Sequence, residues 1–189
     1  MALSRRAGRG STADDPDPGS GPPADPESVA RTIALSRLTS QPRTRAELAD
    51  TMAGRLVPDD VAARVLDRFE EVGLVDDAAF ARSWIESRQS GRGLARRALA
   101  QELRRKGVSD EVAREALDEI DTDVEEDAAR ELVRRKLRSL RSVDHQARVR
   151  RLTGMLARKG YPAGLAFRVV RDELDRFGDD TDGLTAPID

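Results

Sequence analysis

The chain has 189 residues, no cysteine and a formal net charge of −2 at pH 7. Without cysteine it can form neither a disulfide nor a thiolate metal site, and it has no cysteine nucleophile. No apolar run approaches the ~20 residues that a membrane-spanning helix requires, and no apolar signal core follows the arginines near the N-terminus. We therefore expect a cytoplasmic protein that makes no contact with membranes.

The two ends of the chain differ in composition from its middle. Residues 1–27 are rich in Gly, Ser, Pro, Asp and Ala and contain no aromatic residue, and residues 178–189 carry four aspartates and no base. Such segments cannot bury enough apolar surface to offset the entropy lost on ordering. We expect 1–27 to be a disordered tail and 178–189 to be an acidic disordered tail.

Between the tails, one short pattern occurs three times. Val57-Pro58-Asp59-Asp60-Val61 is restated after 51 residues as Val108-Ser109-Asp110-Glu111-Val112, and after a further 53 as Tyr161-Pro162-Ala163-Gly164-Leu165. Each copy begins an amphipathic helix with apolar residues at helical spacing. Helical units that repeat at a nearly constant period stack side by side into elongated molecules.

Each copy contains three helices whose apolar positions align in order. The fold class is therefore all-α, with three tandem three-helix repeats, at 28–75, 76–121 and 122–177, forming an elongated, modular protein. No stretch shows the sustained alternation of a strand. In the first helices, the aligned apolar positions are Val29, Ile33 and Ala34 in copy one, Phe80, Trp84 and Ile85 in copy two, and Ala128, Leu132 and Val133 in copy three. In the second helices they are Leu48 and Met52, then Leu99 and Leu103, then Leu152 and Leu156. In the third helices they are Val61, Val65 and Leu66, then Val112, Ala116 and Leu117, then Leu165, Val169 and Val170.

Residue types that are common at helix termini occur near the expected ends of the helices. Gly107 and Gly160 each follow an Arg/Lys cluster, as glycines at helix C-termini do. Asp76-Asp77 and Glu125-Glu126-Asp127 could supply carboxylates to Mg²⁺. Both runs lie at the expected start of a first helix, where negative charge favours the helix dipole, so we interpret them as capping groups.

Positive charge is concentrated in two windows that cover the second helices of the second and third copies. Residues 88–106 hold seven bases against one acid, and residues 130–159 hold eleven against two. A solvated helix face explains any single arginine, whereas the two clusters together suit a charged, extended partner. Guanidinium groups favour carboxylate or phosphate. The candidate partner-binding residues are Arg88, Arg97, Arg104, Arg105, Lys106, Arg150, Arg151, Arg158 and Lys159.

No pattern of a catalytic site is present in the sequence. His145 is the sole histidine and has no nucleophile or orienting carboxylate in a recognisable motif. Gly91-Arg92-Gly93 lacks the context of a phosphate-binding loop. Phe80 and Trp84, one helical turn apart, are expected to form a core pair rather than a base-stacking platform. We predict a protein that is not an enzyme and that needs no cofactor and no metal.

The segment 73–88, Gly-Leu-Val-Asp-Asp-Ala-Ala-Phe-Ala-Arg-Ser-Trp-Ile-Glu-Ser-Arg, resembles the signature of the RecX family, the bacterial regulators of RecA recombinase. Segments at Ala30-Arg31, 38–48, 99–108 and 150–161 resemble the same family in the same order, so the resemblance covers about 28–177. Lys159 and Tyr161 stand where Arg and Phe are common in the family, which is a mild departure.

The resemblance implies a non-enzymatic modulator that lies along the groove of the RecA–DNA filament. Such a protein inhibits RecA ATPase, strand exchange and co-protease activity, and so tempers recombination and the SOS response. We expect a monomer with weak, nonspecific DNA contact through phosphates. Two other interpretations remain: a DNA-binding protein of three-helix modules, which the acidic third helices disfavour, and a general helical-repeat scaffold.

Overall fold

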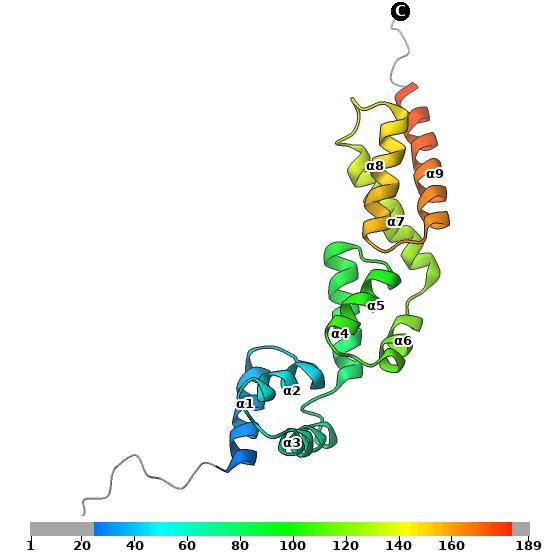
Figure 1. Cartoon of the computed structure of the whole chain (residues 1–189). Coiled ribbons are helices and arrows are strands. Elements are labelled where there is room, and N and C mark those ends of the chain that lie inside the picture. The colour runs from blue at the N-terminus through cyan, green and yellow to red at the C-terminus, as the bar shows by residue number, and fades with distance from the viewer. Residues whose placement is uncertain (1–24, 183–189) are drawn as a thin grey trace, which may run out of the picture.

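The computed structural model describes residues 25–182, and within this range the chain forms nine α-helices and no strand. Figure 1 shows them as three units that follow one another along an elongated molecule. The expected all-α fold of three three-helix repeats is confirmed. The units comprise α1 (Pro26–Ser40), α2 (Arg45–Ala53) and α3 (Asp59–Glu71); α4 (Asp77–Arg92), α5 (Arg96–Arg105) and α6 (Asp110–Asp118); and α7 (Thr122–Leu137), α8 (His145–Arg158) and α9 (Ala163–Asp182).

The first and last helices extend slightly into the segments that we assigned to the tails. Helix α1 begins at Pro26, where the Asp25 side chain accepts a hydrogen bond from the Ser28 N–H and caps the helix. Helix α9 runs to Asp182. The rest of both tails, 1–24 and 183–189, lies outside the described residues.

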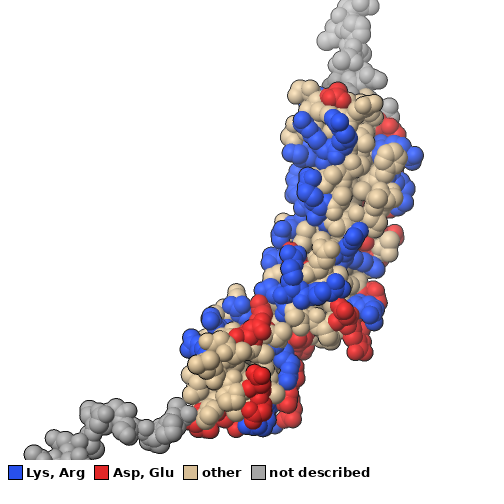
Figure 2. Space-filling model, viewed as in Figure 1, with Lys and Arg blue, Asp and Glu red and all other residues tan. Residues whose placement is uncertain are grey.

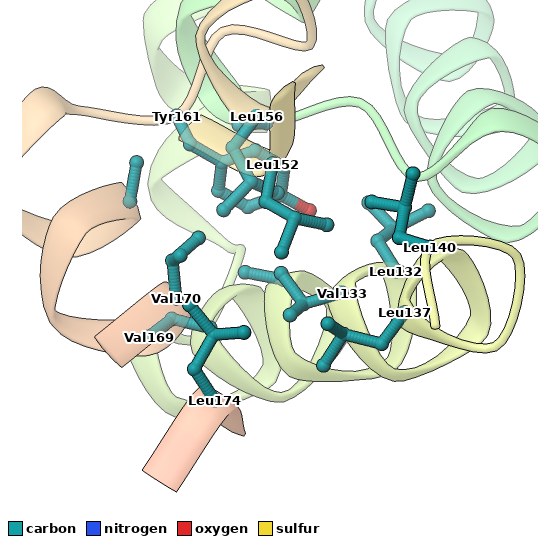
Figure 3. Close-up of a cluster of buried hydrophobic side chains, with 13 residues drawn as sticks. Leu132, Val133, Leu137, Leu140, Leu152, Leu156, Tyr161, Val169, Val170 and Leu174 are labelled. Carbon is teal, nitrogen blue, oxygen red and sulfur yellow. The ribbon is translucent and has the colours of Figure 1, made fainter. Parts of the chain in front are cut away.

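Each unit has its own hydrophobic core, because the substantial helix–helix contacts in the described chain join helices of the same unit. Leu152 and Leu156 of α8 are fully buried, and in Figure 3 their side chains face Val133 of α7 and Val170 of α9. Their counterparts in the other units are also fully buried: Leu48, Met52, Leu99 and Leu103. The helical spacing of apolar residues therefore predicted the buried faces correctly.

The second helix of each unit is followed, at the equivalent position, by a residue in the left-handed backbone region. The φ angles are 61° at Leu56, 78° at Gly107 and 91° at Gly160. A Cβ atom on Gly160 would lie 2.5 Å from the Ala98 nitrogen, and one on Gly107 would overlap Ala46. Glycine is therefore required twice for close approach between units. Leu56 is 91% exposed, so none of the described units packs against it.

Neighbouring units meet at their second helices. The C-terminal end of the second helix in one unit lies against the N-terminal start of the second helix in the preceding unit. The Thr44 hydroxyl donates to the Lys106 carbonyl oxygen at 2.6 Å, and the Ala95 N–H donates to the Lys159 carbonyl oxygen at 2.9 Å. Helices α8, α5 and α2 thus follow one another end to end (Figure 1). The negative end of one helix dipole meets the positive end of the next, which favours this arrangement.

Carboxylates at the start of a first helix complete these junctions. The Arg45 N–H donates to Asp77 Oδ1 at 2.9 Å, and the Arg96 N–H donates to Glu125 Oε1 at 2.9 Å. The capping interpretation is confirmed for Asp76, which caps its own helix by accepting from the Ala79 N–H. Asp77 and Glu125 instead cap a second helix of the preceding unit. Burial raises the pKa of the Asp77 carboxyl, as expected for a group enclosed at a junction.

Candidate partner-binding surface

The nine basic residues singled out in the sequence fall into two structural groups. Arg88, Lys106 and Lys159 are partly buried and are engaged in contacts within the molecule. The remaining six are exposed on α5 and α8: Arg97, Arg104, Arg105, Arg150, Arg151 and Arg158. These six side chains can reach a partner without disturbing the fold.

Arg88 and Lys106 flank the indole ring of Trp84. The Arg88 Cζ lies 4.0 Å from the ring centroid and the Lys106 Nζ lies 4.8 Å from it, both within the range of cation–π attraction. Glu102 accepts hydrogen bonds from Trp84 Nε1 at 3.0 Å and from Arg88 Nε at 3.1 Å. The Phe80 ring stacks on Trp84 at 5.6 Å between centroids. The expected aromatic pair is therefore present, with Trp84 half-buried and held by charged groups.

Lys106 also joins the first unit to the second, because its Nζ donates to Glu47 Oε1 at 2.7 Å. Lys159 has the matching position at the second junction, where its Nζ donates to the Arg92 carbonyl oxygen. Burial, with Arg135 and Arg92 nearby, lowers the pKa of the Lys159 ammonium. Both lysines act mainly as junction residues.

Tyr161 shares the second junction with Lys159. Its hydroxyl donates to the Gly93 carbonyl oxygen at 3.3 Å. Burial, and the nearby Glu125 carboxylate, raise the pKa of Tyr161 to about 12. The tyrosine thus stays neutral and ties the third unit to the end of α4.

The six exposed arginines have few internal partners. Arg104 Nε lies 3.3 Å from Asp110 Oδ1, but both side chains are 70% exposed, so this ion pair contributes little. Arg105 donates to the Gln101 carbonyl oxygen. Among the described residues, the other four form no ion pair with a carboxylate: Arg97, Arg150, Arg151 and Arg158. Their charge remains available to a partner.

Arg97 lies between two cavities and so connects parts of this surface. A cavity of about 330 Å³ at the second junction is lined by Arg97, Arg158 and Tyr161, among others. A cavity of about 410 Å³ between α5 and α6 is lined by Arg97 and Arg104, together with acidic residues of α6. The structure therefore brings Arg97 close to Arg158 on one side and to Arg104 on the other, whereas Arg150 and Arg151 line neither cavity.

The charged side chains are unevenly distributed on the face drawn in Figure 2. Lysine and arginine gather over the second and third units, whereas acidic side chains are prominent over the first unit and around α6. An extended partner would thus meet a mainly basic surface along two of the three units. This matches the two basic windows of the sequence.

Sequence reasoning assigned no role to Arg96, which is central to the second junction. Its guanidinium donates to the Ile120 carbonyl oxygen and lies 3.8 Å from the Glu125 carboxylate. The sequence patterns also did not indicate an arginine-lined cavity at the free end of the third unit. The window of eleven bases covers most of that cavity's arginines, but Arg176 comes from a separate helix, and this juxtaposition is visible only in the fold.

The described residues contain no group of three or more His, Cys, Asp or Glu side chains placed to hold a metal ion. His145 is exposed and begins α8. None of the helices in the described range is long and apolar enough to cross a bilayer.

Comparisons with known proteins identify the three units individually. Family models described as the first, second and third three-helix domains of RecX match residues 30–69, 76–117 and 123–170. The chain is 56% identical over 163 residues to the regulatory protein RecX of Streptomyces lividans, covering 86% of this chain and 87% of that protein. It is 54% identical over 169 residues to that of Thermobifida fusca, covering 89% and 91%.

Two solved structures share the fold. A crystal structure of RecX from Lactobacillus salivarius superposes with a TM-score of 0.73 at 19% identity, covering 79% of this chain and 97% of that one. A second crystal structure, of a regulatory protein RecX, gives a TM-score of 0.69 at 22% identity, covering 79% and 73%. The arrangement of three helical units is therefore common to all three chains.

Proposed function

This chain belongs to the RecX family of regulatory proteins, and from that premise we propose that it binds the RecA–DNA filament and inhibits RecA. The inhibited activities would be ATP hydrolysis, strand exchange and co-protease function, so that recombination and the SOS response are tempered. The observation that carries the proposal is the family membership, which rests on three domain matches in order and on relatives more than half identical over most of the chain.

The geometry suggests how such binding would work. The end-to-end arrangement of α8, α5 and α2 spaces the units along one line, so each unit can meet a successive part of a repetitive partner. Exposed arginines on α5 and α8 suit carboxylates or phosphates on that partner. Several weak contacts on linked units raise the overall affinity without any single strong contact.

The alternative of a groove-reading DNA-binding protein finds less support. Its third helices would have to present base-reading side chains, but Asp67 and Glu70 of α3 are ion-paired with Arg45. Exposed acids also dominate the polar face of α6, and negative charge is repelled by the phosphate backbone. Phosphate contact by the exposed arginines remains compatible with binding to a DNA-containing filament.

The test is the ATPase activity of RecA on single-stranded DNA, measured as the purified chain is added. We expect inhibition at ratios well below one protein per RecA protomer, and parallel loss of strand exchange. Unchanged ATPase and strand exchange at a large excess of the chain would contradict the proposal. The matched variants in the Discussion separate binding through the exposed arginines from general loss of structure.

A further inference from the structure

Positive charge gathers in a cavity of about 410 Å³ at the free end of the third unit, away from the junctions (Figure 1). The cavity is lined by four arginines and one acid, Glu173, together with Leu137 and Phe177. The arginines are Arg134, Arg138, Arg141 and Arg176, from the end of α7, the α7–α8 connection and the last turns of α9. The lining therefore carries more positive than negative charge.

Two of these arginines have an acidic partner inside the molecule and two do not. Glu173 is 3% exposed and accepts hydrogen bonds from Arg134, at 2.6 and 2.9 Å, and from Arg176 at 2.9 Å. Arg138 and Arg141 are exposed and form no ion pair with a carboxylate among the residues that the structure describes. Their positive charge therefore remains in a partly enclosed space, where it attracts anions more strongly than on an open surface.

Acidic residues of the same chain follow this cavity directly in the sequence. Helix α9 ends at Asp182, and three of its last four residues are aspartate. Carboxylates are disfavoured at the C-terminal end of a helix because they lie at the negative end of the helix dipole, and the last turn of α9 contains no basic residue. The segment 183–189 adds a further acid, Asp189, and no base. A cationic group from another element would offset this negative charge.

The segment 183–189 is long enough to return to the cavity. Phe177, in the cavity wall, precedes the end of α9 by only five residues, which is ~7.5 Å along a helix that rises ~1.5 Å per residue. Seven extended residues span up to ~25 Å. The segment therefore reaches Arg138 and Arg141 without any change in the three helices of the unit.

The cavity and the acidic segment occur together in the third unit alone. Helix α9 has 20 residues, whereas the equivalent helices α3 and α6 have 13 and 9. The match to the third RecX domain ends at residue 170, before the part of α9 that lines the cavity. The connection 138–144 is also longer than its counterparts at 41–44 and 93–95. Both features are thus additions to the repeated three-helix unit.

We propose that residues 183–189 fold back and occupy this cavity, with the Asp189 carboxylate against Arg138 and Arg141. The acidic end of the chain then competes with external anions for the third unit. Guanidinium groups pair well with carboxylates. Phe177 already has the guanidinium groups of Arg141 and Arg148 beside its ring, at 5.8 Å each, so the contact depends on charge rather than on stacking.

The covalent link between the segment and α9 makes this contact effective even if it is weak. A short tether gives the segment an effective concentration on the order of millimolar at the cavity, whereas a second copy of the chain would lose translational freedom on binding there. An external anion enters the cavity only in molecules whose segment is released, so its apparent affinity falls in proportion to that fraction. The cavity is thus a self-blocked anion site.

The position of the segment is tested in the full chain by paramagnetic broadening. Because the chain contains no cysteine, a nitroxide can be attached at one introduced site, Ala186→Cys. We expect broadening of the backbone amide signals of 138–144 at low salt and its loss at high salt, since screening weakens exposed ion pairs.

Two paired variants show whether the unpartnered arginines hold the segment. Arg138→Gln with Arg141→Gln should abolish the broadening of the α7–α8 connection. Arg135→Gln with Lys136→Gln, two exposed bases of α7 outside the lining, should leave it unchanged. Broadening that is absent from the otherwise unchanged chain, or that is equal in the two paired variants, would overturn the proposal.

A mixed sample separates contact within one chain from contact between two copies. Isotope-labelled chain without a nitroxide is mixed with nitroxide-labelled chain that gives no signal. We expect no broadening in this mixture. Broadening there as strong as in the singly labelled chain would assign the segment to the cavity of a second copy and would overturn the contact within one chain.

Binding of inorganic tripolyphosphate, measured by calorimetry, reports access to the cavity. A variant shortened after Asp182 retains all the described residues and should bind about two- to tenfold more tightly than the full chain, as expected if the segment occupies the cavity in about half to nine-tenths of molecules. The gain should vanish when Arg138→Gln and Arg141→Gln are present and persist with Arg135→Gln and Lys136→Gln. No gain, or the same gain in both backgrounds, would overturn the proposal.

Circular dichroism melting checks that each variant is folded before its result is interpreted. Should the Arg138→Gln, Arg141→Gln variant prove unfolded, Asp189→Asn in the full chain decides the outcome. It should reduce the broadening of 138–144 and tighten tripolyphosphate binding, and no change in either would overturn the proposal. These assays contain no RecA, so their result is independent of the test of the proposed function.

Discussion

The ammonium group of Lys106 crosses the junction between the first and second units, with Nζ 2.7 Å from Glu47 Oε1 and 4.8 Å from the centre of the Trp84 ring. A single side chain therefore links two cores that otherwise share few contacts. Because the ion pair is only partly exposed, it is screened less than a surface pair. This contact gives the junction a defined geometry.

Lys106 and its exposed neighbours should respond differently to charge reversal. Arg104→Glu with Arg105→Glu should weaken filament binding and ATPase inhibition while leaving the melting temperature nearly unchanged, because exposed charges add little to stability but control association. Lys106→Glu should lower the melting temperature as well, because it places two carboxylates together. Filament co-sedimentation across salt and thermal melting of each variant check this. Tight binding by the double variant at all salt concentrations would contradict a role for α5.

Gly160→Ala should weaken the docking of the third unit onto the second. The new Cβ would lie 2.5 Å from the Ala98 nitrogen, in a left-handed backbone that disfavours side chains. We expect a loss of about 2–3 kcal/mol in the free energy of unfolding, which combines strain and overpacking. Gly164→Ala is the matched control, since nothing lies within 4 Å of its added Cβ. Urea unfolding should show little change for Gly164→Ala, and similar curves for both variants would be inconsistent with a close junction.

Trp84→Ala should destabilise the second unit, because it removes a ring contacted by Phe80, Arg88 and Lys106. Truncation of a large core aromatic costs about 3–5 kcal/mol, and the half-buried position of Trp84 places the expected loss near the lower end. The sole tryptophan should emit at a blue-shifted wavelength in the folded chain. Denaturant unfolding followed by fluorescence and circular dichroism measures both quantities. A water-exposed emission maximum with unchanged melting in the variant would assign Trp84 to the surface.

Stability should depend on pH through Glu173. Burial acts to raise the pKa of this carboxyl, but the hydrogen bonds and ion pairs with Arg134, Arg176 and Arg130 together lower it below its ordinary value of 4.5. A lowered folded-state pKa means that ionised Glu173 stabilises the fold above that ordinary value, and that this contribution is lost as the pH falls through the folded-state pKa. Glu173→Gln should therefore cost about 2 kcal/mol at pH 7, within the range for hydrogen bonds to a charged group, and progressively less below pH 4.5.

Urea unfolding of wild type and Glu173→Gln at several pH values gives the comparison. Glu131→Gln, an exposed acid on α7 for which no ion pair is present among the described residues, is the control. A difference between wild type and Glu173→Gln that is the same at pH 7 and pH 3 would show that Glu173 does not act through its charge.

The sequence predicted the helices and their buried faces because both follow from local periodicity. Leu99 and Leu103, or Leu152 and Leu156, stand one turn apart in the chain and must face the same way in a helix. The junctions depend instead on which helix end lies opposite which. The carboxylates of Asp77 and Glu125 were recognised as capping groups, but only the fold shows that the helices they cap belong to the preceding unit.

Contacts between distant segments also explain why some residues predicted to bind a partner lie instead at a junction between units. A run of bases such as Arg104-Arg105-Lys106 looks uniform in sequence. In the helix these side chains point in different directions, so Arg104 and Arg105 reach solvent while Lys106 turns toward the first unit. Partial burial of a lysine needs a carboxylate or aromatic partner from another segment, here Glu47 and Trp84. Such partners lie far away in the chain, and local patterns do not reveal them.

The leucine at position 56 gives the array a defined end. At the two internal junctions the equivalent residue is glycine, and the next helix approaches so closely that a side chain would collide with it. Leu56 carries the side chain that such an approach excludes. A fourth unit, or the opposite end of another copy of this chain, therefore cannot join there by the contact used inside the molecule. The contact that joins successive units therefore ends at the first unit, where a leucine replaces the glycine of the two internal junctions.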